Sequence, residues 1–269
     1  MSALGSSTSG AARVMETLRT SPRRLMFTAI AVLLTGAVAG CSSGGAAVSP
    51  STGAPSAPAS AAAPQWLPGA GHAGVPIPAG TYAVAVNGTT IPAPVPVIRV
   101  PAGYTGRGFA VTAGTGETDP DTAVAPDHRA LSFWEVQSVF NNPCKAGKHG
   151  VDPGPTVADL ARALAAQPLR AGSDPVPVTV AGYHGLYVDT SVPAHIDFSK
   201  CQDGYFDSWI GTGDHGRFQQ GPGQRDSLWI LDVNGYRLVI DGEHMPGATQ
   251  AQIDEITGMV KTLTFQTTN

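Results

Sequence analysis

The stretch "SLWILDVNGYRLVIDG" (residues 227–242) contains two runs rich in β-branched, aromatic and aliphatic residues on either side of Asn234-Gly235. The turn that best joins two adjacent antiparallel strands requires positive φ at both of its central residues, and the pair Asn-Gly tolerates this best. The stretch therefore predicts a β-hairpin, that is, two neighbouring antiparallel strands joined by a tight turn.

More strand-like runs precede the hairpin, and two helical patterns accompany them. In "PTVADLARALAAQP" (residues 155–168) and "TQAQIDEITGMVKTL" (residues 249–263), apolar residues recur at helical spacing behind a capping box. Pro168 ends the first helix. The strand-like runs are residues 81–86, 96–100, 108–112, 131–136, 176–180 and 185–192. This order predicts an α+β fold, an antiparallel β-sheet sandwich covered by a few helices, in a single domain over residues 66–269.

The N-terminal part of the chain has the three-part organisation of a secretory signal. A basic stretch ends at Arg23-Arg24, a 16-residue apolar run covers residues 25–40, and Cys41 follows directly. The run is shorter than a typical membrane-spanning helix. The sequence "VAGC" (residues 38–41) resembles the lipobox of bacterial lipoproteins. That resemblance implies removal of residues 1–40 and a diacylglyceryl anchor on Cys41. An ordinary secretory signal with a chance cysteine is the alternative.

Residues 41–65 are predicted to form a disordered tether. The segment is made largely of Ala, Ser, Pro and Gly, without an aromatic or charged residue. Such a composition buries too little apolar surface to offset the entropy of ordering. The tether would hold the globular domain away from the membrane to which a doubly acylated Cys41 is anchored.

The charge of the mature chain argues against a nucleic-acid partner. The full sequence has 16 basic and 20 acidic residues, and the predicted signal removes four of the former and one of the latter. The remaining 12 and 19 give a net charge of −7, which repels phosphate backbones and anionic lipids.

Two cysteines remain after lipidation, Cys144 and Cys201. In an oxidising compartment, two remaining cysteines most often form a disulfide, and we predict one here. The alternative is a metal site completed by His149 or His195, but this spacing matches no standard zinc pattern.

Several segments of the globular part resemble actinobacterial envelope proteins of unknown function. They include "AGTY" (residues 79–82), "VPAGY" (100–104), "FWEVQSVFNNPC" (133–144) and the hairpin with its final helix. The closing order of hairpin, helix and short strand also resembles the PsbP-like sandwich fold. These resemblances imply a sandwich fold and an extracytoplasmic localisation, and they imply no particular activity.

No local catalytic motif occurs: the sequence lacks a nucleophile elbow, a zinc-binding helix motif and a phosphate-binding glycine loop. Glu117, Asp119 and Asp121 could bind calcium through carboxylate oxygens, but a solvated turn explains them better. His184 is expected at a hairpin tip. Neither a metal nor a cofactor is therefore expected.

The tryptophans Trp134, Trp209 and Trp229 all fall in strand-like runs. In a row on an exposed face they would stack on sugars, whereas buried they would be core, which is commoner. Trp209 is the one most expected to be exposed, because its strand leads directly into a polar glycine-rich loop.

That loop supplies the candidate binding surface. Residues 211–216 include Asp214 and His215, and Arg217 follows. Glycines allow a backbone to approach a ligand closely, and Arg217 could pair with a carboxylate or phosphate. We expect Trp209 to keep part of its ring exposed with Arg217 beside it.

The sequence thus predicts a lipid-anchored extracytoplasmic binding or accessory module of the cell envelope, with a glycan or a protein as its partner. It is more consistent with a binding protein than with an enzyme. The alternatives are an envelope hydrolase whose site includes His215 or His195, and a lipid carrier with a large apolar cavity.

Overall fold

The computed structural model describes residues 63–69, 74–87, 94–117, 124–145, 147, 150–213 and 216–266. The chain divides into the units Met1–Ala59 and Ser60–Asn269, and every described residue belongs to the second. The predicted signal peptide, Cys41 and nearly all of the predicted tether lie outside the described residues. Within the described residues, no helix combines the length and hydropathy that crossing a membrane requires.

The fold is mostly β-structure, and its largest sheet contains nine strands. All neighbouring strands in this sheet run antiparallel. Its strands, in spatial order, are β10 (Val176–Val180), β11 (Tyr183–Ser191), β14 (Arg225–Val233), β15 (Tyr236–His244), β7 (Arg129–Trp134), β6 (Ala110–Ala113), β5 (Thr105–Gly106) and β2 (Val75–Pro76), and β9 (Ala171–Gly172) also pairs with β11.

The hairpin predicted around Asn234-Gly235 is confirmed as β14–β15. Asn234 has a φ of 56° and Gly235 a φ of 85°, the left-handed values that the tight turn requires. The carboxylate of Asp232 accepts a hydrogen bond from the amide of Gly235 at 2.6 Å and fixes the turn. This hairpin lies within the nine-stranded sheet, so it sets the register on which the neighbouring strands pair.

Two smaller sheets accompany the large one. The first consists of β1 (Gln65–Trp66), β3 (Gly80–Ala83), β4 (Val95–Val100) and β16 (Thr264–Gln266), with only the β1–β3 pair parallel. The second consists of β13 (Gly216–Phe218), β12 (Asp207–Gly211) and β8 (Val136–Val139). Three short 3₁₀ turns complete the described structure: η1 (Pro143–Lys145), η2 (Phe198–Lys200) and η3 (Gln202–Gly204). Gln65, which the sequence assigns to the tether, pairs with Tyr82 and already belongs to the folded part.

Two α-helices occur in the described residues, α1 (Val157–Ala165) and α2 (Gln250–Lys261). Both predicted capping boxes are confirmed: Thr156 with Asp159, and Thr249 with Gln252. Each helix therefore begins where its side chains satisfy the first unpaired backbone amides.

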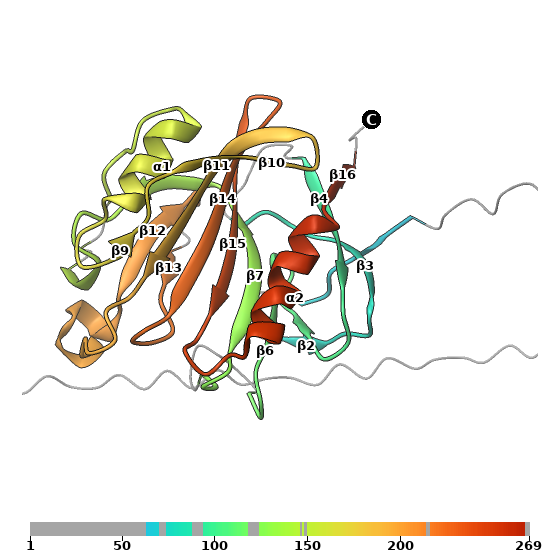
Figure 1. Ribbon diagram of the computed structural model, residues 1–269, viewed down its shortest axis with the longest axis horizontal. Coiled ribbons are helices and arrows are strands. Elements are labelled where there is room, and N and C mark those ends of the chain that lie inside the picture. The colour runs from blue at the N-terminus through green and yellow to red at the C-terminus, as the bar shows by residue number, and fades with distance from the viewer. Residues whose placement is uncertain are drawn as a thin grey trace, which may run out of the picture. The chain divides into compact units, whose positions relative to one another are not determined.

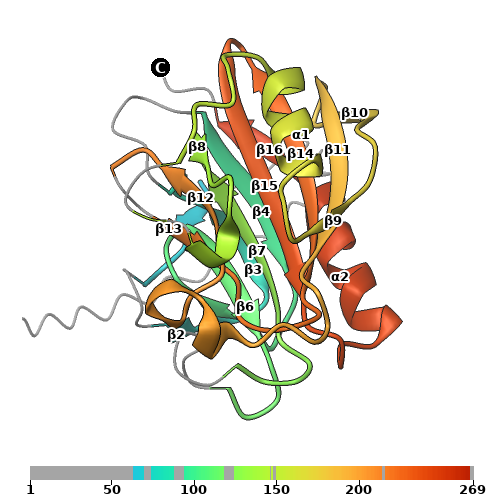
Figure 2. The ribbon, with the colours of Figure 1, turned by 90° about the vertical axis from the view of Figure 1, so that its left-hand side faces the viewer.

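The central strands β14 and β15 are buried on both faces, since successive residues point to opposite sides of the sheet and both sides are covered there. Trp229 and Leu231 of β14 pack with Ile256 of α2, whereas Leu228 and Ile230 pack with Leu160 of α1. Figure 1 accordingly shows α1, β12 and β13 on one side of β14 and β15, and α2 with β3 and β4 on the other. Figure 2 places β8, β12 and β13 on the viewer's side of β7 and β15.

Candidate functional site

The structure contradicts the expectation that Trp209 is exposed. Its side chain is fully buried, at 0% exposure, and meets Trp134 edge to face with 5.8 Å between ring centroids. Trp209 is buried because β12 packs against the nine-stranded sheet, and the Trp209 side chain points into the core between them. Trp134 and Trp229 are buried as well, so the three tryptophans form no exposed row.

Arg217 lies beside Trp209, as expected, but within the protein. The two residues are partners in the β12–β13 register, and Arg217 is only 4% exposed. Asp214 and His215 lie outside the described residues. The surface predicted from the sequence therefore has neither its aromatic ring nor its guanidinium available to a ligand.

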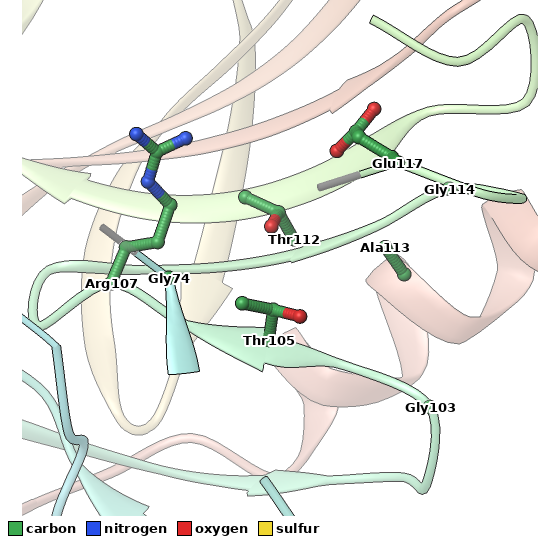
Figure 3. Close-up of a pocket in the computed structure, with 8 residues that line it drawn as sticks. All are labelled: Gly74, Gly103, Thr105, Arg107, Thr112, Ala113, Gly114 and Glu117. Carbon is green, nitrogen blue, oxygen red and sulfur yellow. The ribbon is translucent and has the colours of Figure 1, made fainter. Parts of the chain in front are cut away.

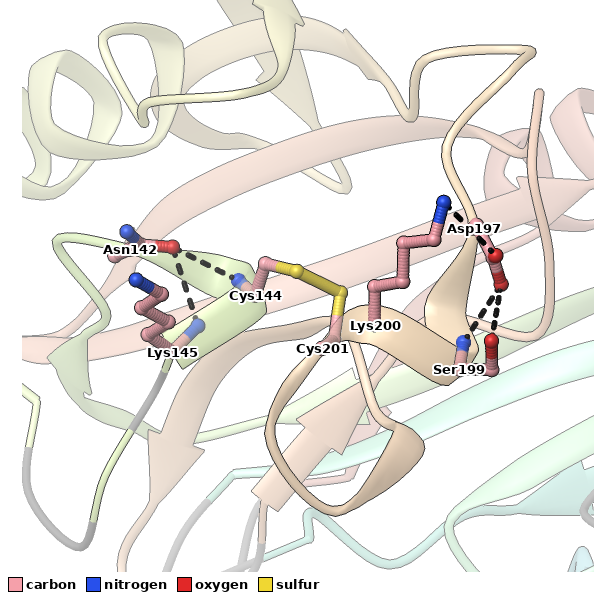
Figure 4. The surroundings of a disulfide bond; sticks show 7 residues. All are labelled: Asn142, Cys144, Lys145, Asp197, Ser199, Lys200 and Cys201. Atoms are coloured by element: carbon pink, nitrogen blue, oxygen red, sulfur yellow. Dashed lines mark hydrogen bonds and ion pairs between the residues drawn. A yellow bond between two sulfur atoms is a disulfide. The ribbon is translucent and has the colours of Figure 1, made fainter.

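The predicted disulfide is confirmed. Cys144 and Cys201 are bonded, with 4.4 Å between their Cα atoms. Figure 4 shows the bond joining the η1 turn, where the side chain of Asn142 accepts from two backbone amides, to the segment after η2. Because both cysteine sulfurs are in the disulfide, Cys144 and Cys201 cannot serve as thiolate ligands of the alternative metal site.

Of the other histidines singled out in the sequence, the structure describes His184 and His195. His195 is exposed, and within the described residues its ring has no hydrogen-bond partner. His184 is exposed near the β10–β11 turn, with Nδ1 3.1 Å from Thr179 Oγ1. His149, Asp119 and Asp121 lie outside the described residues.

A network of buried charged side chains was not anticipated from the sequence. Arg217 donates from Nε to Asp241 at 2.9 Å and from Nη2 to Glu243, and its Nη2 lies 3.5 Å from Asp226. Arg170 donates to Asp226, and its other terminal nitrogen donates to Ser208 Oγ at 2.7 Å. All three carboxylates come from β14 and β15, on the face of the sheet that packs against β12 and β13.

Two guanidinium groups thus meet three carboxylates. Burial raises the pKa of Asp241 to about 6, and neighbouring Asp226 adds to this, although Arg217 acts in the opposite direction. Oδ1 of Asp241 has no hydrogen-bond partner within the described residues. The carboxylates lie close enough together to share one ion. Since Arg217 already serves as their common cation, we assign no metal here.

The network extends to His128 and Glu117. His128 Nε2 lies 3.2 Å from Glu243, and Nδ1 lies 2.8 Å from Glu117. Glu117 also accepts from the amide of Ala125 at 2.9 Å. Because a carboxylate occupies each ring nitrogen of His128, neither nitrogen is available to activate a nucleophile.

Glu117 also lines a polar pocket of about 160 Å³. Figure 3 shows Arg107 and Glu117 on opposite sides of Thr112. At Gly114 a side chain would not fit without a shift of its neighbours, because a Cβ there would lie 2.8 Å from the Cβ of Ala125 and 2.9 Å from a carboxylate oxygen of Glu117. The complete lining is Gly74, Gly103, Thr105, Arg107, Thr112, Ala113, Gly114 and Glu117. The residues that line the pocket are spread over 44 positions of the sequence, so no local sequence motif predicts the pocket.

A shallower groove of about 470 Å³ lies between the start of α1, β11 and the end of the β14–β15 hairpin. Leu186 and Val157 supply apolar surface, while His184, Asp232 and Arg237 supply polar groups. Arg237 donates to the carbonyls of Gly154, Thr156 and Val136. These bonds hold α1 to β8 and β15, which gives Arg237 a structural role.

Comparison with protein-family models found no match to this chain. Searches among curated proteins and among solved structures likewise found none that is similar to it.

Proposed function

We propose that the protein is a lipid-anchored, extracytoplasmic binding or accessory module of the cell envelope. The lipobox-like sequence before Cys41 supports the extracytoplasmic localisation. The Cys144–Cys201 disulfide supports it as well, because disulfides are typical of oxidising compartments. The acidic mature chain and the resemblance to actinobacterial envelope proteins agree with that localisation.

For the fold we propose the finer class of an α+β sandwich. It is supported by the burial of both faces of the central strands β14 and β15, with α2 packed on one face and α1 on the other. The two smaller sheets would then act as additional cover. A PsbP-like arrangement remains part of this proposal.

The binding site we propose is the polar pocket that contains Glu117. The single observation that carries this choice is that Glu117, a buried carboxylate held by His128, also faces a cavity. The hydroxyls of Thr105 and Thr112 and the side chain of Arg107 complete a lining with hydrogen-bond donors and acceptors. The cavity is smaller than the usual pocket for drug-sized ligands, which indicates a small polar ligand.

Binding without catalysis is the better interpretation of this site. Both nitrogens of His128 are engaged. Of the two histidines that the sequence offers for a hydrolase, His195 is exposed and isolated within the described residues, and His215 lies outside them. A lipid carrier needs a large apolar cavity, and a small pocket lined by threonine, arginine and glutamate does not suit acyl chains.

The test compares the small molecules that copurify with the mature protein extracted from its own membranes. Thr112→Val removes one hydroxyl from the pocket with little change in shape, and Thr179→Val on the exposed strand β10 is the matched control. We expect mass spectrometry to find one small polar compound with the wild type and the control, and much less with Thr112→Val. Equal recovery from all three proteins, or recovery of none, would contradict the pocket as the binding site.

A further inference from the structure

A second surface, separate from the polar pocket, combines aromatic rings with carboxylates. Tyr205 is 50% exposed, and its ring lies against that of Phe218 with 5.2 Å between centroids. Asp207 pairs with Phe218 across the β12–β13 ladder, so their side chains share a face. We call Asp203, Tyr205, Asp207 and Phe218 the Tyr205 surface.

The alternation of side chains along this segment explains why it faces outward. Phe206 is fully buried and packs with Cys201 and Val192. Tyr205 and Asp207, on either side of it in extended backbone, point the other way. Residues 205–207 thus bury the ring of Phe206 and direct the side chains of Tyr205 and Asp207 outward.

The surface is held in a fixed conformation. The disulfide at Cys201 ties the preceding turn to η1 (Figure 4), and Phe206 stacks on Phe198 with 5.5 Å between centroids. Underneath, Arg217 donates to the carbonyl of Phe218. An exposed aromatic residue on a segment anchored at so many points loses little conformational freedom when it binds a ligand.

The negative charge of the surface has no counter-ion within the described part of the chain. The carboxylate of Asp207 is half-buried and makes neither a hydrogen bond nor an ion pair there. Burial, together with the nearby charge of Asp203, raises the pKa of Asp207 to about 6.

Two cations of the surrounding elements, Lys200 and Arg217, pair with other carboxylates. Lys200 lies 3.6 Å from Asp197, and Arg217 is occupied by Asp241 and Glu243 in the interior. The carboxylates of the Tyr205 surface therefore receive no compensation from either of them.

We propose that the Tyr205 surface binds a cationic amine, with the ammonium group placed against the Tyr205 ring and facing the carboxylates of Asp207 and Asp203. An aromatic face attracts a cation through its quadrupole, and a partly desolvated carboxylate strengthens this attraction. A neutral sugar could also stack on the ring, but it would leave two neighbouring carboxylates without a counter-charge. Charge complementarity therefore favours the amine.

The experiment titrates the full mature protein, in detergent, with tetramethylammonium chloride and separately with N-acetylglucosamine. Sodium chloride at matched ionic strength is the salt control. The readout is the NMR chemical shift of the Tyr205 ring, assigned by comparison with Tyr205→Phe. We expect the ammonium salt to shift this resonance saturably, while sodium chloride and the sugar leave it in place.

Asp207→Asn tests the carboxylate directly, because it keeps the shape and removes the charge. We expect it to weaken binding of tetramethylammonium about tenfold, because the coulombic attraction of one partly desolvated carboxylate is lost. Asp197→Asn, an exposed carboxylate in the same region, should bind as the wild type does. Unchanged binding by Asp207→Asn, a response to the sugar alone, or no response to either probe would overturn the proposal, and none of these outcomes bears on the Glu117 pocket.

Discussion

The guanidinium of Arg217 lies over the indole of Trp209, 5.9 Å from the ring centroid, in the interior between two sheets. On its other side the same guanidinium meets Asp241 and Glu243 of β15. One buried cation thus connects the core of the three-stranded sheet to the nine-stranded sheet. Its removal would leave Asp241 without its hydrogen-bond partner and Glu243 without its arginine, in a region of low dielectric.

Arg217→Met is therefore expected to lower the free energy of unfolding by about 3–5 kcal/mol, the usual effect of breaking a buried ion pair from one side. Arg162→Met is the control, because its side chain is 70% exposed and pairs only with Asp159 at the surface. We expect the control to change stability by less than about 1 kcal/mol. Urea denaturation followed by tryptophan fluorescence measures both. Equal effects of the two substitutions would argue against Arg217 as the internal counter-ion.

Asp241 should make stability depend on pH in a definite direction. Its pKa is raised to about 6 in the folded protein from an ordinary value of 3.8, so the folded state binds more protons than the unfolded chain between these values. Stability from this group consequently falls as pH rises through that window. Relative to Asp241→Asn, the wild type should gain up to about 3 kcal/mol between pH 7 and pH 4.

The measurement is a series of urea unfolding curves for both proteins over that pH range. The variant serves as the reference that cancels the titration of all other groups. A constant difference between the two proteins would show that Asp241 has no raised pKa.

The disulfide closes a loop between residues that are 57 positions apart. In the chain-entropy model such a loop contributes about 4 kcal/mol, an upper value. The double variant Cys144→Ala/Cys201→Ala should accordingly unfold at clearly lower urea concentration than the oxidised wild type. Adding a reductant should lower the stability of the wild type and leave that of the variant unchanged. A wild type that does not respond to reduction would contradict this contribution.

The hairpin, both capping boxes and the disulfide could be predicted because each depends on few residues close in sequence or on a count of cysteines. The position of Trp209 could not, because its exposure depends on which sheet covers β12. Arg217 was singled out for its charge, but its carboxylate partners come from strands that only the tertiary fold brings together. Glu117 was noted as an acid in a turn, and nothing local connects it to Arg107 or His128.

The central claim is that a lipid anchor on Cys41 holds this module at the outer face of the cell membrane. The most direct measurement is mass spectrometry of the N-terminal peptide of protein isolated from membranes, alongside metabolic labelling with a palmitate analogue. We predict a mature chain that begins at Cys41 with a diacylglyceryl group, and a Cys41→Ala variant that takes up no label. A membrane-derived chain that retains the residues before Cys41, or equal labelling of wild type and variant, would contradict it.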